Sequence, residues 1–112
     1  MLVSLKENAT FRRLYQRGRS AGNRYLVLYC RPNRLGHNRL GLTVSTKLGH
    51  AVVRNRIRRR LREVYRLSEA ELKQGFDLVL VARTACVDAS FSALTASFVS
   101  LTDKLDLKRS EV

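Results

Sequence analysis

The chain has 112 residues, of which 22 are Lys or Arg and 9 are Asp or Glu, so its net charge at pH 7 is +13. Hydrophobic residues make up 45% of it, enough for one core, which excludes a disordered basic tail. So large an excess of positive charge destabilises a compact state unless an anion neutralises it. We therefore expect a folded protein that binds a large anionic partner.

The two cysteines, Cys30 and Cys86, are too few and too far apart for a disulfide framework or a zinc module. We interpret them as small core residues in a reducing compartment. No apolar run approaches the roughly 18 residues of a membrane span, and the first residues lack the apolar stretch of a signal peptide. The expected location is the cytoplasm, without membrane contact.

The first predicted element is a helix over residues 9–17, with apolar side chains at i, i+3 and i+4 and Gly18 as its C-terminal cap. Residues 25–30 alternate in the manner of a strand, with Leu26, Leu28 and Cys30 on one face and tyrosines on the other. After a loop, residues 39–45 show the same alternation, with Leu40, Leu42 and Val44 on one face. These two strands are predicted to form a hairpin.

From Ala51 the apolar residues recur at helical spacing, which predicts a long helix that ends near Leu67. Residues 68–75 resemble a capping box followed by a second short helix. Residues 76–82 are nearly all apolar, as in a strand buried on both faces, and their distance from the preceding strand indicates a parallel crossover.

An apolar repeat over residues 90–106 predicts a final amphipathic helix, and the tail from about residue 107 is expected to be frayed. The predicted order is α, β, β, α, β, α. This order describes a single α+β domain over residues 1–112, with helices packed on one sheet. A right-handed crossover would be the usual choice.

The long predicted helix carries seven arginines between residues 54 and 66, against one acid, Glu63. A merely solvated face would interleave acids at i, i+4. The planar guanidinium group matches phosphate oxygens bidentately, so this helix is predicted to grip a nucleic-acid backbone. Arginines on both edges of the buried stripe suit backbone contacts better than base reading in duplex DNA, and RNA is favoured.

A Gly-containing turn over residues 47–53 leads into the free N–H groups of this helix, a favourable place for a phosphate between Lys47 and Arg54. Aromatic residues at helix and strand spacing are commonly core residues. The alternative is a stacking platform for single-stranded nucleic acid beside the basic edge. For His37 and His50 we favour polar loop roles over general-base work. No pair of acids has the spacing of a two-metal nuclease site, so we expect neither catalytic residues nor a protein-bound metal.

Three blocks of the sequence resemble the protein subunit of bacterial ribonuclease P, over about residues 5–105. The first two blocks are Phe11-x-x-x-Tyr15-x-x-Gly18 followed by Arg24-x-x-x-x-Tyr29, and Gly41-Leu-x-Val-Ser45. The third and most specific block is Lys47-x-Gly49-x-Ala51-Val52-x-Arg54-Asn55-Arg56-x-Arg58-Arg59-x-x-Arg62.

The resemblance implies an RNA-binding subunit of ribonuclease P, a tRNA 5′-maturation endoribonuclease whose chemistry is carried by its RNA. The protein would bind the catalytic RNA and the 5′ leader of precursor tRNA, broaden the substrate range and lower the magnesium requirement. Magnesium would act through the RNA subunit, with one protein per RNA. By resemblance, the residues that contact the catalytic RNA are Arg54, Asn55, Arg56, Arg58, Arg59 and Arg62. Those that contact the leader are Phe11, Tyr15, Tyr29, Lys47 and Arg54.

The same resemblance implies an α/β sandwich with a four-stranded sheet and a left-handed βαβ crossover, similar to domain 2 of ribosomal protein S5. The alternative function, from a different class, is a basic ribosome-associated or RNA-chaperone protein that works without a ribozyme.

Overall fold

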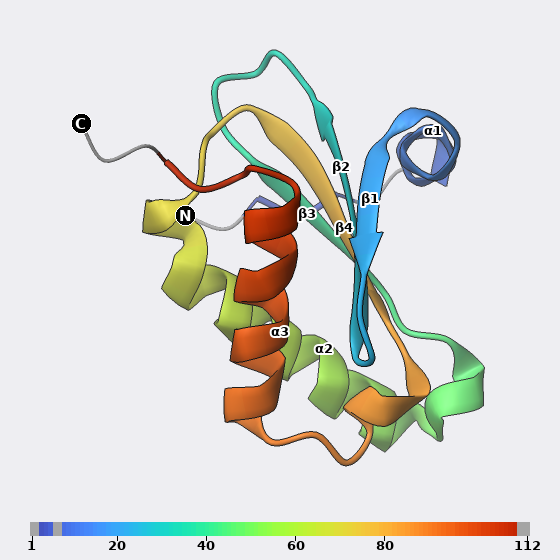
Figure 1. The fold of residues 1–112 in the computed structure, drawn as a ribbon. Helices are drawn as coiled ribbons and strands as arrows, with labels where there is room; N and C mark the ends of the chain where they lie inside the picture. The colour runs from blue at the N-terminus through green and yellow to red at the C-terminus, as the bar shows by residue number, and fades with distance from the viewer. Residues whose placement is uncertain (1–2, 6–7, 110–112) are drawn as a thin grey trace.

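The computed structural model describes residues 3–5 and 8–109, which form three helices and one four-stranded sheet (Figure 1). The elements in chain order are α1 (Asn8–Arg17), β1 (Arg19–Gly22), β2 (Leu26–Pro32), β3 (Arg39–Thr43), α2 (Ala51–Ser68), β4 (Phe76–Ala82) and α3 (Phe91–Lys104). The predicted α+β class is confirmed. The three main helices and the three predicted strands end within two residues of their expected bounds.

The strands lie in the order β1-β2-β4-β3, so β4 separates the two strands that the sequence predicted as a hairpin. β4 pairs antiparallel with β2 and parallel with β3. The hairpin prediction is therefore wrong. The physical reason is the composition of β4. Most of its side chains are apolar and are buried in cores on both faces of the sheet, which favours an inner position between two other strands.

β1 is the strand that periodicity missed, because its four residues, Arg-Ser-Ala-Gly, are small or polar and mostly exposed. It forms the true hairpin with β2, in which Arg19 lies opposite Cys30. The four-stranded sheet implied by the family resemblance is confirmed. The parallel crossover through α2 is confirmed as well, whereas its left hand stays a prediction.

The sheet separates a large core from a small one. Alternate residues of β4, Leu78 and Leu80, belong to the large core under α2 and α3, which lie side by side on that face (Figure 1). Val79 faces the opposite way, into a small cluster with Leu14 of α1. α1 is thus the one helix on its face of the sheet among the described residues, and the surface around it is left open.

One expectation in the second half of the chain is wrong. The predicted short helix over residues 68–75 is a single 3₁₀ turn, because α2 continues through Ser68, whose side chain makes no capping hydrogen bond. Beyond α3, Leu107 is buried and the Arg109 N–H donates to the Glu71 carbonyl at 2.8 Å, whereas fraying of the tail stays a prediction. Residues 110–112 lie outside the described part of the chain.

Candidate nucleic-acid interface

α2 presents its arginines on a rigid scaffold that the core holds in place. Ile57, Leu61 and Val64 are at most 1% exposed, and they fasten one side of the helix to the sheet. The residues predicted to contact the catalytic RNA all lie outside this buried stripe; Arg54 and Arg58 are half-buried, and the exposed members are Asn55, Arg56, Arg59 and Arg62. These residues cover the solvent-facing side of α2 from one edge of the buried stripe to the other, and we call them the α2 surface.

Among the described residues, no acid forms an ion pair with the arginines of the α2 surface. Glu63, the one acid of α2, is held by Arg66, whose Nε donates to its carboxylate at 3.0 Å. This hydrogen bond lowers the pKa of Glu63. Arg58 donates instead to the neutral Asn55 side chain at 3.0 Å, and Arg56 to the Val87 carbonyl at 3.3 Å. Both acceptors are neutral, so neither of these two guanidinium groups is paired with an acid in the described part of the chain.

The turn before α2 is shaped by Gly49, whose φ of 142° lies in the left-handed region that favours glycine. Upstream, the Ser45 hydroxyl accepts from the Lys47 N–H at 3.2 Å, and Lys47 itself is exposed. Arg54 folds back so that its Nε donates to the Gly49 carbonyl at 3.2 Å. Lys47 and Arg54 thus lie at the two ends of this turn, and a phosphate held between them stays a prediction.

The predicted aromatic residues form a cluster between α1 and the sheet. The ring centroid of Tyr15 lies 6.5 Å from that of Phe11 and 4.9 Å from that of Tyr29. Tyr15 is 40% exposed, and its hydroxyl bonds the Thr43 hydroxyl at 2.7 Å. Two of the rings are partly buried and the third is open to solvent, so the cluster is both part of the small core and a surface.

A groove of about 690 Å³ runs along this cluster, between α1, β3 and α2. Its lining residues are Asn8, Phe11, Arg12, Tyr15, Leu42, Thr43, Val44 and Arg58. We call it the aromatic groove. Arg58 also belongs to the α2 surface, so the two predicted surfaces meet at this side chain.

Not every predicted leader residue lines the aromatic groove. Tyr29 reaches it only through its contact with the Tyr15 ring, and Lys47 and Arg54 lie at the start of α2. Tyr25, which the strand pattern placed on the same face as Tyr29, instead packs against the large core, with the Arg24 guanidinium 5.7 Å from its ring centroid.

Sequence reasoning missed two contributors to the aromatic groove. A Cβ placed on Gly41 would lie 2.5 Å from the Phe11 ring, so this glycine is what lets Phe11 lie against β3. Arg12 lines the groove with no signal in the sequence beyond its place next to Phe11. The motif Gly41-Leu-x-Val-Ser45 offered a signal for the glycine, whereas the position of Arg12 depends on how α1 is rotated over the sheet.

The described residues hold no group of three or more His, Cys, Asp or Glu side chains that could bind a metal ion. Within the same part of the chain, no helix is long and apolar enough to cross a membrane. Cys30 and Cys86 are both buried free thiols, as predicted. The side chains that the α2 surface and the aromatic groove present are mainly guanidinium groups and aromatic rings. Guanidinium groups bind phosphates, and aromatic rings stack on bases.

Comparison with known proteins gives consistent results. A family model described as Ribonuclease P matches residues 2–106. The "Ribonuclease P protein component" of Alkaliphilus oremlandii is 41% identical over 108 residues, covering 96% of this chain and 95% of the relative, and that of Thermoanaerobacter sp. is 43% identical over 106 residues, covering 95% and 91%.

Solved structures of similar proteins lead to the same family. The RNase P protein of Staphylococcus aureus superposes with a TM-score of 0.87 at 32% identity, covering 97% of this chain and 100% of that one. The RNase P protein of Thermotoga maritima gives a TM-score of 0.81 at 28% identity, covering 97% and 98%.

Proposed function

The chain belongs to the ribonuclease P protein family, and from this premise we propose how its two surfaces divide the work. Its enzyme is ribonuclease P, which matures the 5′ ends of tRNA; the chain is the protein subunit, and its partner is the ribonuclease P RNA. In our proposal the α2 surface holds that RNA, one protein per RNA, and the aromatic groove holds the 5′ leader of precursor tRNA.

The observation that supports this division is the contrast between the surfaces. The α2 surface is a row of guanidinium groups that find no carboxylate partner among residues 3–5 and 8–109, which suits it to backbone phosphates of a folded RNA. The aromatic groove offers the exposed ring of Tyr15 with Arg12 and Arg58 beside it, suited to a single strand whose bases are free to stack.

The proposed effect on catalysis is differential binding. A protein that holds leader nucleotides next to the tRNA site of the catalytic RNA adds binding energy to the precursor but none to the matured product. Its positive charge also replaces counterions where two RNAs converge, so the magnesium requirement of the RNA falls. The polypeptide supplies no reacting group in this scheme; hydrolysis belongs to the RNA and its magnesium ions.

The test is reconstitution with the catalytic RNA of the same source at low magnesium. We expect cleavage of precursor tRNA only when RNA and protein are both present. Arg62→Ala should weaken binding to the catalytic RNA, because Arg62 lies on the α2 surface away from the aromatic groove. Tyr15→Ala should weaken precursor binding by about 1–3 kcal/mol, the value of one stacked base, with assembly intact.

Arg58→Ala is the informative third variant. Because Arg58 lies on both surfaces, its loss should weaken assembly and precursor binding together. Equal losses of both activities in all three variants would contradict the two-surface proposal, whereas cleavage by the protein alone would overturn the assignment of the chemistry to RNA.

A further inference from the structure

A second concavity lies on the other side of α1, at the edge where β2 ends and where β3 and β4 begin. Its volume is about 540 Å³, and no residue of α2 lines it. Its lining residues are Thr10, Arg13, Leu14, Arg31, Pro32, Asn33, Arg34, Arg39 and Asp77. We call it the arginine pocket, because four arginines from three separate segments converge on it.

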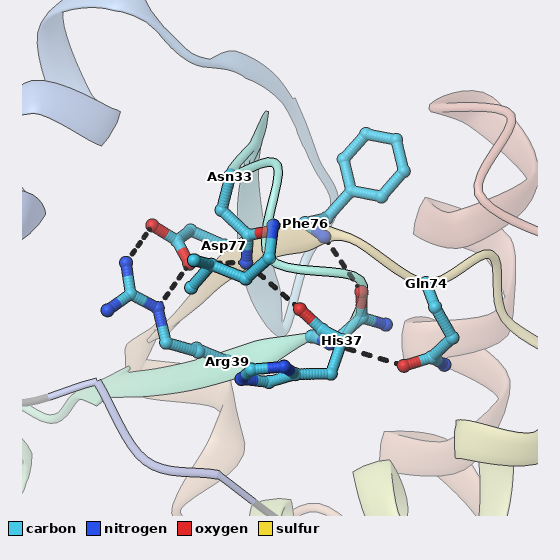
Figure 2. A network of polar contacts seen from close by, with 8 residues as sticks. Asn33, His37, Arg39, Gln74, Phe76 and Asp77 are labelled. Carbon is cyan, nitrogen blue, oxygen red and sulfur yellow. Dashed lines mark hydrogen bonds and ion pairs between the residues drawn. The ribbon is translucent and has the colours of Figure 1, made fainter.

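Asp77, the one acid among the described lining residues, is already engaged. Arg39 donates to both of its oxygens at 2.8 Å, through Nε and Nη2, and the Asn33 side chain donates a third hydrogen bond at 2.9 Å (Figure 2). Four arginines and one carboxylate leave the lining with a charge of 4 − 1 = +3. Like charges held in one concavity repel one another, so the pocket is suited to a multivalent anion.

Arg31 supplies a hydrogen-bond donor that the described part of the chain does not satisfy. Its Nη1 is buried and has no hydrogen-bond partner there, although Asp77 lies directly opposite Arg31 in the β2–β4 register. A buried donor without an acceptor is costly, and more so when it is charged. Arg31, which lines the arginine pocket, thus adds a guanidinium group whose charge and donors are not fully compensated by the described residues.

The loop that carries Arg34 is held in a defined conformation by the side chain of Asn33. Asn33 accepts from the Leu35 N–H at 2.9 Å and donates to the His37 carbonyl at 3.0 Å, besides its bond to Asp77 (Figure 2). Between these bonds Arg34 adopts φ = 62°, a left-handed conformation that is unfavourable for a residue with a Cβ. The same asparagine thus organises the ion pair and the turn that places Arg34 on the arginine pocket.

We propose that the arginine pocket binds a backbone phosphate of RNA, as a third contact separate from the α2 surface and the aromatic groove. Guanidinium groups that converge from several directions match the several oxygens of a phosphate. RNA is the phosphate-bearing polyanion that this subunit meets, and this is the one point at which the inference rests on the proposed function. The phosphate belongs either to the catalytic RNA or to the precursor leader, which share the same chemistry.

The experiment measures RNA affinity as a function of salt for wild type, Arg31→Gln, Arg31→Lys and Arg34→Gln. One arm uses the catalytic RNA alone; the other uses the holoenzyme with precursors that carry a long or a short leader. Lys104→Gln is the matched control, since it also removes one positive charge, but from an exposed position at the end of α3. Circular dichroism checks the fold, and Arg34 lies in an exposed loop, so its removal spares the core.

For Arg31→Gln and Arg34→Gln we expect weaker binding in one arm, with the slope of log affinity against log salt reduced by about 0.7. Arg31→Lys should keep the slope. A loss in the first arm assigns the phosphate to the catalytic RNA; a loss that depends on leader length assigns it to the leader. The inference would be overturned if Arg31→Gln and Arg34→Gln fold normally and, in both arms, give the same slope of log affinity against log salt as Lys104→Gln. Wild-type protein that binds neither RNA would instead refute the proposed function.

Discussion

At the scale of single residues, Tyr15 combines two contacts that substitution can separate. Its exposed ring is available for stacking, and its hydroxyl is bonded to Thr43 in the aromatic groove. We expect Tyr15→Phe to leave precursor affinity near the wild-type value, because the stacking ring is kept and the lost hydrogen bond is made to Thr43 within the protein. Tyr15→Ala should cost at least about fivefold through the lost stacking. Fluorescence titration of the holoenzyme with labelled precursor would measure both; an equal loss in the two variants would show that the hydroxyl matters more than the ring.

The two thiols give a residue-scale prediction on pH. Burial raises the pKa of Cys30 and of Cys86, and the Cys86 thiol also donates to the Tyr25 carbonyl. A raised folded-state pKa contributes stability that is complete below the unfolded-state pKa of about 8.5 and is lost as the pH rises toward the folded-state value. The free energy of unfolding should therefore fall as the pH rises above about 8.5.

Urea unfolding at several pH values would measure this fall. The matched control is the double variant Cys30→Ala with Cys86→Ala, which should be less stable at pH 7 but should lose less stability on the way to high pH. Burial also raises the pKa of Tyr65. Part of the fall in the free energy of unfolding above about pH 10 should therefore remain in the double variant. Identical pH profiles for wild type and the double variant would contradict the assignment to the thiols.

At the scale of elements, the position of α1 depends on the absence of a side chain on β3. A Cβ on Gly41 would lie 2.5 Å from the Phe11 ring and 3.3 Å from the Leu5 side chain. Gly41→Ala should therefore push α1 away from the sheet, lower the stability by about 1–3 kcal/mol and weaken precursor binding. Thermal unfolding and precursor titration would measure the two effects.

Gly22→Ala is the matched control, since its Cβ would meet only an ordinary contact of 3.4 Å with Val27 on β2. We expect it to leave both the unfolding temperature and the precursor affinity near the wild-type values. If Gly41→Ala behaved in the same way, α1 would not depend on the close approach of Phe11 to β3, and the aromatic groove would be more adaptable than its contacts indicate.

At the scale of the whole molecule, the net charge of +13 acts on stability and on binding in opposite directions. Salt screens the repulsion within the folded protein, so raising NaCl from about 0.05 M to about 0.5 M should raise the unfolding temperature. The same change should lower RNA affinity by at least about tenfold, because counterion release drives binding. Differential scanning calorimetry and filter binding would measure the two effects; a fall in both quantities would show that self-repulsion does not limit the stability of the folded state.

What the sequence by itself determined is local or periodic. The apolar repeat of α2 placed its arginines on one exposed face, the alternation of β2 separated core residues from Tyr29, and three spaced motifs identified the family. These inferences hold because a helix repeats every 3.6 residues and a strand every two, whatever the rest of the chain does.

Tertiary structure alone decided which distant segments meet. It put β4 between β2 and β3, brought Arg58 of α2 into the groove of Tyr15, and gathered Arg13, Arg31 and Arg34 around one pocket. No local pattern encodes these encounters, because they depend on strand order and on the rotation of α1 over the sheet. Both follow from burial of the two faces of β4, a property of the assembled core rather than of any one segment.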